Sequence, residues 1–315
     1  MSTLEQTAAS VSLPHAEVKA AKPRRPRFRD TWWRHLVAIV FGAFALFPPF
    51  YVLSAAFNRD PSLTGASLIP AHFTWDNFRK LFSQGNSTTE ITSNASNFVH
   101  WITNTLIVAS ATAFLTVMLG ALAAYAFSRF RFRGRRIGMV FLLLVQMFPQ
   151  MLALVAIYLI VLHVGTVFGF IGINTLTGLI LVYLGGVMSV NVWFMKGFFD
   201  TIPKELDESA RVDGATPAQI FWGVVLPLAA PVLAVISLFS FVATINEFII
   251  ASVLLEDDNK KTLAVGMRGF IDQQYSQHWG PFAAGTLIAA IPVVLLFIFL
   301  QRFIVQGLTA GSVKG

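Results

Sequence analysis

Long apolar stretches alternate with shorter polar segments along most of the chain. A bilayer core about 30 Å thick is crossed by a helix of about 20 apolar residues. Glu247 and Arg302 are the only formally charged residues in the six stretches that reach this length. The pattern predicts an all-α, polytopic membrane protein with six transmembrane helices, at residues 36–57, 98–127, 137–162, 176–195, 226–255 and 282–305.

Prolines interrupt several of the predicted spans. Helices in a bilayer tolerate proline because neighbouring helices can satisfy the freed carbonyl groups, but they usually kink or break there. We therefore expect local distortions at Pro48, Pro49, Pro149, Pro227, Pro231 and Pro292.

The basic residues are sorted between the two sides of the membrane. If the N-terminus lies inside, 17 of the 23 Lys and Arg residues fall in inner segments, and cytoplasmic segments carry such an excess. We expect both termini to be cytoplasmic, residues 1–31 to form a disordered basic tail, and residues 32–315 to form the transmembrane domain. Outer loops are predicted at 58–97 and 256–281, an inner loop at 196–225 and a C-terminal tail at 307–315.

Composition excludes several function classes. Only 12% of the residues are charged and 55% are hydrophobic, which is not the composition of a soluble enzyme. The net charge of +7 includes a basic run beside the first span, which indicates lipid contact rather than nucleic-acid binding. The chain has no cysteine, its six histidines lack metal-ligand spacing, and the phosphate-binding pattern G-x-x-x-x-G-K-[ST] does not occur. We predict no catalytic residue, no metal site and no cofactor in this chain.

The inner loop carries the strongest local signal. Pro203 suits the first position of a helix, and Glu205 follows it near the positive end of the helix dipole. Ile202, Leu206 and Ala210 recur at i, i+4 and i+8 and predict one narrow apolar stripe. The residues between them are mostly polar, so the pattern indicates a short amphipathic helix.

The same loop predicts an ion pair, a sharp turn and a second helix. Asp207 and Arg211 have the i,i+4 spacing of a helical ion pair, and Gly214 suits a left-handed helix end. Thr216 and Gln219 form a capping-box pattern that opens a helix leading into the fifth span. The amphipathic helix either lies on the membrane surface or pushes on a membrane helix, and its residue pattern leaves both alternatives open.

A sequence motif in this loop resembles a family signature. Glu208-Ser209-Ala210-x3-Gly214-x9-Val224-x-Leu226-Pro227 is similar to the E-A-A-x3-G-x9-I-x-L-P motif of permease subunits of ATP-binding-cassette (ABC) importers. Ser209 and Val224 replace the usual Ala and Ile and keep their size class. The resemblance implies that this segment is a coupling helix seated in a cleft of a cytoplasmic ATPase. The residues that it assigns to this contact are Glu205, Glu208, Ser209, Ala210 and Gly214.

Further segments resemble the maltose/maltodextrin type within that family. They comprise residues 146–149, 171–175, 183–186, 213–217, 262–267 and 301–315, so the resemblance covers nearly all of residues 36–315. It implies a tail that reaches the interface between the ATPase subunits, with Gly307, Leu308, Thr309, Gly311 and Lys314. It also implies an outer scoop loop inserted into a sugar-binding protein, here Glu256, Asp257, Asp258, Asn259, Lys260 and Lys261.

The resemblance also implies partners and a location. These are a second, homologous permease, two copies of an ATPase that bind ATP and Mg, an extracytoplasmic sugar-binding protein and the bilayer of a bacterial inner membrane. Maltose or maltodextrin is the expected substrate, with trehalose or another α-glucoside as the alternative. An ATP-independent secondary transporter is a further alternative, but the chain has no clear internal repeat. An intramembrane hydrolase would need a nucleophile with a partnered base, and His100 has no partner carboxylate.

Glu247 is the one charge deep inside a predicted span. A lone carboxylate at that depth costs about 2.5–3.5 kcal/mol, so it should face protein or water. Glu247 is either a pore-lining gate residue or the partner of a structural hydrogen bond to another helix. The same two alternatives apply to Asn246 and Asn191.

Overall fold

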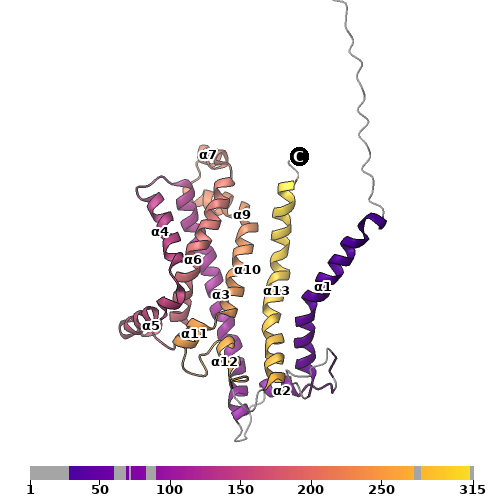
Figure 1. Ribbon diagram of the computed structural model, residues 1–315. Coiled ribbons are helices and arrows are strands. Elements are labelled where there is room, and N and C mark those ends of the chain that lie inside the picture. The colour runs from indigo at the N-terminus through magenta and orange to yellow at the C-terminus, as the bar shows by residue number, and fades with distance from the viewer. Residues whose placement is uncertain (1–27, 60–68, 71, 83–89, 273–277, 313–315) are drawn as a thin grey trace, which may run out of the picture. The chain divides into compact units, whose positions relative to one another are not determined.

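The computed structural model describes residues 28–59, 69–70, 72–82, 90–272 and 278–312 (Figure 1). The chain divides into two units, Met1–Pro48 and Pro49–Gly315. The first contains the N-terminal part of helix α1 (Phe28–Phe57) and the second contains all other described elements. The described elements are helices, apart from an isolated antiparallel bridge between Asn58 and Phe73.

The second unit contains long helices joined by short ones. Its long helices are α3 (Glu90–Arg129), α4 (Arg135–Met147), α5 (Gln150–Val167), α6 (Leu176–Thr201), α10 (Ala230–Asn246) and α13 (Trp279–Ser312). The short elements are α2 (Asp76–Phe82), the 3-10 turn η1 (Gly169–Ile171), α7 (Lys204–Val212), α8 (Pro217–Ile220), the π-turn η2 (Phe221–Val225), α9 (Leu226–Leu228), α11 (Ile249–Leu254) and α12 (Leu263–Arg268).

Helix α3 is the centre of this unit. It packs against α6 and α10, α4 packs against α6, and α13 packs against α10 (Figure 1). Helix α7 lies at the end of the bundle where α3 and α6 finish, whereas α2 and α12 lie at the opposite end. The bundle therefore has two opposite ends, which we call the α7 end and the α12 end.

Each end has its own buried core. At the α7 end, Met195 and Phe199 of α6 pack with Ile220 of α8 and Phe221 of η2. At the α12 end, the core consists of residues from α1, α2, α3, α12 and α13, including Phe98 and Trp101. Short elements at both ends are thus held by apolar burial and not only by their own hydrogen bonds.

Among the described residues, five helices are long and apolar enough to cross a membrane, and a bent helix pair makes a sixth candidate. The third predicted span, 137–162, is divided into α4 and α5 at Phe148 and Pro149. Phe148 is extended (φ −71°, ψ 128°) because a following proline disfavours the helical conformation. The distortion expected at Pro149 is confirmed, whereas α13 continues through Pro292.

The fifth predicted span, 226–255, is not one continuous helix. The segment Pro217–Leu228 meets α10 at an angle of 76°, in a region that contains Pro227 and Pro231. A second break at Glu247 and Phe248 separates α10 from α11. Irregular backbone at membrane depth is tolerated where it is buried in protein or lines a cavity, and this second break borders a cavity described below.

Helix boundaries differ from the expected loops at two places. Helix α1 begins at Phe28, inside the predicted tail 1–31, and α3 begins at Glu90, inside the predicted outer loop 58–97. Both helices continue past their apolar stretch, because a helix may extend beyond the hydrocarbon core into the aqueous region. Residues 1–27 of the predicted tail lie outside the described residues.

Candidate functional site

The amphipathic helix predicted in the inner loop forms as α7. The helix begins at Lys204, one residue later than predicted, because Pro203 is its N-cap and not its first helical residue. Asp213 is its C-cap. Gly214 has φ +84°, the left-handed conformation that glycine adopts without steric cost. The turn therefore ends α7 at the predicted place.

A second helix follows that turn, as predicted. Thr216 and Gln219 form the capping box: the Thr216 N–H donates to Gln219 Oε1 at 2.8 Å, and the Gln219 N–H donates to Thr216 Oγ1 at 3.3 Å. Pro217 occupies the first helical turn. After the turn at Gly214, α8, η2 and α9 lead from this box to α10, which they meet at the bend of 76°.

An ion pair connects α7 to the end of α3. Arg129 Nε donates to Asp207 Oδ2 at 2.7 Å, and the two side chains are only 2% and 4% exposed. Arg129 also donates to the carbonyls of Phe199 and Ile202, at 3.0 and 3.1 Å. The sequence predicted that Asp207 pairs with Arg211. Asp207 is instead buried on the face of α7 that packs against the bundle, where it pairs with Arg129 of α3. One guanidinium thus joins α3, the end of α6 and α7.

Most other side chains of α7 are exposed. Of the predicted contact residues, Glu205, Glu208, Ser209 and Gly214 are exposed, while Ala210 is half-buried against the core. Two apolar side chains of α7, Leu206 and Val212, are 43% and 88% exposed.

The predicted tail continues helix α13. The backbone is helical through Gly307, Leu308, Thr309 and Gly311 to Ser312, and Lys314 lies outside the described residues. The C-terminal end of α13 points toward the same end of the bundle as α7 (Figure 1).

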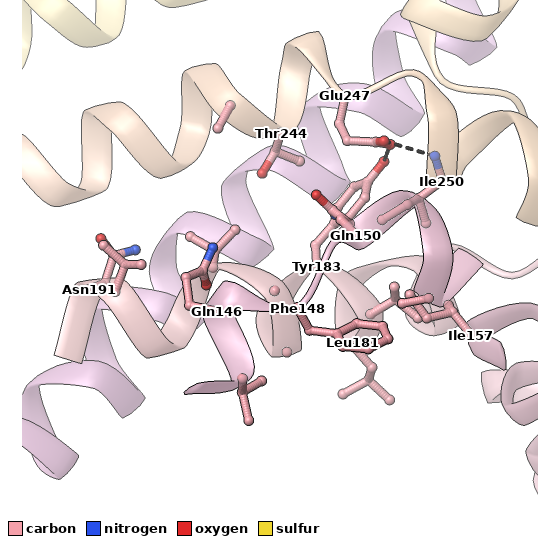
Figure 2. Close-up of a pocket in the computed structure, with 18 of the residues that line it drawn as sticks. Gln146, Phe148, Gln150, Ile157, Leu181, Tyr183, Asn191, Thr244, Glu247 and Ile250 are labelled. Carbon is pink, nitrogen blue, oxygen red and sulfur yellow. Dashed lines mark hydrogen bonds between the residues drawn. The ribbon is translucent and has the colours of Figure 1, made fainter. Parts of the chain in front are cut away.

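A cavity of about 980 Å³ opens between α4, α5, α6 and α10. The two helix breaks face it: Gln146, Phe148 and Gln150 come from the break between α4 and α5, and Glu247 comes from the break between α10 and α11 (Figure 2). Its volume is in the range of about 300–1,000 Å³ that is usual for small-molecule sites.

Glu247 is hydrogen-bonded within this cavity. Its carboxylate accepts hydrogen bonds from the Tyr183 hydroxyl of α6 and from the backbone N–H groups of Ile250 and Ala251, the latter two at 2.8 and 3.0 Å (Figure 2). The side chain therefore caps α11, ties α6 to α10 and lines the cavity at the same time. Both alternatives that the sequence left open are compatible with this position.

Asn191 and Asn246, for which the sequence left open the same two alternatives as for Glu247, lie in different environments. Asn191 is buried, lines the cavity and donates to Ser240 Oγ at 3.2 Å. Asn246 is exposed, donates to the carbonyl of Val242 on its own helix, and is not among the residues that line the cavity.

The loop that contains the predicted scoop residues is fixed at its backbone. Trp101 Nε1 donates to the carbonyl of Asp258 at 2.6 Å, and Asn104 Nδ2 donates to the carbonyls of Asn259 and Lys261 at 2.9 and 3.1 Å. On the other side, Asn174 Oδ1 accepts from the N–H groups at the start of the loop, those of Glu256 and Asp257. Asn174 has φ +59°, which asparagine tolerates better than most residues.

The side chains of this loop remain available for other contacts. Glu256, Asp257, Asp258, Asn259 and Lys260 are exposed, and Lys261 pairs with Asp258. At the same end, burial and the charge of Lys80 lower the pKa of His278, so its imidazole is neutral at pH 7. The loop thus has a backbone held by hydrogen bonds and presents three acidic, two basic and one amide side chain.

Several of these residues were not singled out from the sequence. Arg129 is one of the basic residues counted for the orientation, and nothing in the local sequence distinguishes Trp101. Gln146, Asn174 and Tyr183 lie in segments that carry the family resemblance, which was the available signal. In the described part of the chain, no cluster of His, Asp and Glu could hold a metal ion.

A family model described as "Binding-protein-dependent transport system inner membrane component" matches residues 116–309. This match covers more than half of the chain. The chain belongs to this family. The matched region includes α7, the cavity and the outer loop, so all three candidate features lie within the part that defines the family.

Curated relatives match the permease over almost its full length. It is 42% identical to the maltose/maltodextrin transport system permease protein MalG of Escherichia coli K12, over 89% of this chain and 95% of that protein. It is 41% identical to MalG of Yersinia pestis, over 93% and 96%. It is 40% identical to MalG of Vibrio vulnificus, over 90% and 96%.

Two solved structures share the fold. One is a bacterial ABC transporter involved in the import of the acidic polysaccharide alginate, with a TM-score of 0.71 and 22% identity over 89% of this chain and 99% of that one. The other is a bacterial alginate ABC transporter with a periplasmic protein bound to an alginate pentasaccharide, with a TM-score of 0.60 and 17% identity over 87% and 94%. The expected ABC importer permease fold is confirmed.

The predictions of function class are confirmed by this membership. The chain is a MalG-like, multi-pass inner-membrane permease subunit of a binding-protein-dependent ABC importer. It is not catalytic, and ATP is bound by a partner ATPase. It works in a complex that includes a periplasmic binding protein.

Proposed function

We propose that the permease imports maltose, maltodextrins or a related α-glucoside. The observation that carries this proposal is the 42% identity to MalG of Escherichia coli over 89% of this chain and 95% of that protein. Trehalose or another oligosaccharide is the alternative, because elements that receive an ATPase or a binding protein do not themselves select the sugar. In this proposal, the chain pairs with a second, homologous permease above two copies of the ATPase.

The α7 end of the bundle faces the cytoplasm in this proposal. Arg129, Arg135, Arg136, Lys196 and Arg211 belong to segments at that end. The loop 256–261 at the α12 end has Glu256, Asp257 and Asp258 against Lys260 and Lys261, a net charge of −1. An excess of Lys and Arg marks the cytoplasmic side, and this orientation presents α7 to a cytoplasmic ATPase.

Helix α7 transmits the closure of the ATPase in this proposal. Its exposed face, with Glu205, Glu208, Leu206 and Val212, contacts the ATPase. Its buried face is bound by Arg129, which also holds the end of α6. A displacement of α7 is therefore passed to α3 and α6 through Arg129 and to α10 through the turn at Gly214.

The rigid outer loop receives the binding protein in this proposal. The scoop residues 256–261 project from a backbone that Trp101, Asn104 and Asn174 hold. A loop fixed in advance loses little conformational entropy on docking. The C-terminal tail, residues 307–315, is proposed to contact the ATPase pair beside α7.

The test is to purify the chain with its co-encoded partners in lipid and to measure ATP hydrolysis with a panel of sugar-loaded binding proteins. We expect maltose or maltodextrin to stimulate hydrolysis most strongly. Stimulation by trehalose alone would select the alternative, and no stimulation by any α-glucoside would refute the proposed substrate class.

A further inference from the structure

We propose that Asn174 is a positioning residue for coupling: it fixes the outer loop 256–261 to the beginning of α6, so that docking of the binding protein is passed along α6 to α7. The inference rests on the proposed function, because it takes the loop as the docking site and α7 as the ATPase contact. Asn174 itself is assigned no contact with either partner, since it acts through the loop.

Asn174 holds the end of α11 and the start of the loop at the same time. Its Oδ1 accepts hydrogen bonds from the N–H groups of Glu256 and Asp257, the latter at 3.0 Å. Its own N–H donates to the carbonyl of Leu254, the last residue of α11, at 2.9 Å. Asn174 makes these bonds with φ +59°, a conformation that Asn and Asp adopt more readily than most residues with a side chain. The residue type therefore suits this clamp.

The turn that carries Asn174 is packed directly on α6. Thr175 is the N-cap of this helix, and its Oγ1 accepts from the N–H of Gly178 at 3.1 Å. A Cβ at Gly178 would lie 2.7 Å from the carbonyl oxygen of Ile171 and 2.8 Å from that of Gly172, a separation that only glycine permits. A displacement of Asn174 is therefore a displacement of the beginning of α6.

Helix α11 is attached to α6 a second time, at its other end. Glu247 accepts from the N–H groups of Ile250 and Ala251 at 2.8 and 3.0 Å, and the Tyr183 hydroxyl of α6 donates to the same carboxylate (Figure 2). Buried apolar side chains of α11, including Leu254, belong to one core with apolar side chains of α6. Both ends of α11 are thus bound to α6, so the loop that follows it shifts together with that helix.

Helix α6 is continuous from these contacts to α7 (Figure 1). It comprises 26 residues without proline, a length of about 39 Å at about 1.5 Å per residue. At its far end, the carbonyls of Phe199 and Ile202 accept from Arg129, whose guanidinium pairs with Asp207 of α7. A push on the loop therefore reaches α7 along one unbroken helix.

Helix α3 supports this route, whereas α10 does not. Trp101 and Asn104 of α3 hold the later part of the loop, and α3 packs along α6. Helix α10 is separated from its neighbouring segments by the bend of 76° and by the break at Glu247. Docking at the loop therefore acts on the pair of α3 and α6, and Asn174 is the residue that includes α6 in that pair.

Substitution of Asn174 separates ordering of the loop from transmission. Asn174→Gly removes Oδ1, keeps the backbone N–H and adopts φ +59° without strain. Asn174→Asp keeps an acceptor at the same position and tolerates the same conformation. Ser252→Ala is the control, because it removes a hydroxyl of α11 whose hydrogen bond goes to the carbonyl of Ile249 in the same helix. Each variant is assembled as the complete complex in lipid, and ATP hydrolysis is measured against the concentration of maltose-loaded binding protein.

We expect the maximal rate at saturating binding protein to fall at least about fivefold in Asn174→Gly, since couplings between sites are usually of that size or larger. Asn174→Asp should recover most of the rate, and Ser252→Ala should match the unsubstituted complex. A higher half-maximal concentration with an unchanged maximal rate would overturn the inference, because Asn174 would then only order the loop. No stimulation of the unsubstituted complex by any sugar-loaded binding protein would instead refute the proposed function, and the inference with it.

A binding measurement tests the same coupling from the α7 end. Coupling between two sites is reciprocal, so closure of the ATPase by a non-hydrolysable ATP analogue should raise the affinity for the binding protein. We expect this increase in the unsubstituted complex and in Ser252→Ala, and an increase at least about fivefold smaller in Asn174→Gly. Tyr183→Phe, which removes the second attachment of α11 and keeps the ring, is an independent variant and should also reduce the increase. An equal increase in either variant and in the control would contradict transmission through α6.

Discussion

At the scale of single residues, the contact between Arg129 and Asp207 is the most consequential one in the molecule. Both side chains are almost fully buried, and the guanidinium also satisfies two backbone carbonyls at the end of α6. A buried ion pair contributes little net stability compared with apolar packing, but the removal of one partner leaves an uncompensated charge. The pair therefore determines where α7 is attached.

The variant Asp207→Ala leaves the Arg129 charge buried without its partner. We expect a loss of about 3–5 kcal/mol from the free energy of unfolding of this region, and sugar uptake that falls further than ATP hydrolysis because α7 loses its attachment. Thermal unfolding of the purified complex and parallel assays of uptake and hydrolysis measure both effects. Asp213→Ala removes an exposed carboxylate next to the same helix and should change stability by no more than about 0.5 kcal/mol. Equal behaviour of the two variants would show that the buried pair has no special role.

Gly266 is a residue that the fold requires to be glycine. A Cβ there would lie 2.1 Å from Trp101 Cδ2, in the ring whose Nε1 holds the carbonyl of Asp258. We expect Gly266→Ala to cost about 1–3 kcal/mol through overpacking and to weaken docking of the binding protein, measured by thermal unfolding and by a binding titration. Gly197→Ala, where the new methyl meets nothing, is the control. A fully stable Gly266→Ala variant with normal docking would refute the role of Trp101 as an anchor.

Local sequence identified some of these residues and not others. Gly214 and the capping box of Thr216 and Gln219 were predictable, because helix ends depend on neighbours within a few residues. Arg129 was not, because its partner is 78 positions away and the i,i+4 rule favoured Arg211 for Asp207. Gln146 and Gln150 become distinctive only when the helix breaks are placed around a common cavity.

At the scale of elements, α7 and the turn after it connect the end of α6 to α8, η2 and α9, which lead to α10. The turn depends on the left-handed conformation of Gly214, and its N–H donates to the carbonyl of Arg211 at 3.0 Å. Any substitution that forbids either feature redirects the chain between α7 and α8.

The variant Gly214→Pro tests this connection. Proline requires φ near −65° and has no N–H, so it excludes both the observed conformation and the hydrogen bond. We expect transport to be abolished while membrane insertion stays intact, measured by uptake and by the amount of permease in isolated membranes. Gly214→Asn, which can adopt the left-handed conformation, should keep most of the uptake. Normal uptake by Gly214→Pro would disprove the assignment of residues 203–214.

Removal of residues 307–315 tests the end of α13. The deletion shortens a helix whose end points toward the α7 end, so we expect weaker stimulation of ATP hydrolysis by the loaded binding protein and an intact bundle. ATPase assays with and without that protein provide the measurement. Unchanged stimulation would exclude a role of this tail in coupling.

Continuous helices were easier to predict than broken ones. The apolar pattern predicted α3, α6 and α13 well, because length and composition decide such spans. The fifth span was predicted as a single helix, although a bend of 76° and the break at Glu247 divide it. The break at Glu247 contains no proline or glycine, and a carboxylate from that position caps α11. Only tertiary contacts, such as the hydrogen bond from Tyr183, make that conformation favourable.

At the scale of the whole molecule, the bundle has no nucleotide site, so its work must be driven from its surfaces. The α7 end offers an exposed helix that Arg129 attaches to α3 and the end of α6, and the α12 end offers a loop whose backbone is held by hydrogen bonds. The cavity lies between these ends, lined by segments that are themselves broken helices. This arrangement is suited to a protein that is moved by partners and does not catalyse a reaction.

The most direct test is uptake of labelled maltodextrin into proteoliposomes that contain the complete complex and loaded binding protein, compared with liposomes that contain this permease alone. The account predicts uptake that requires ATP, the ATPase subunits and the binding protein together, and no uptake by the permease alone. Accumulation of sugar by the permease alone, or uptake by the complex without ATP, would contradict it.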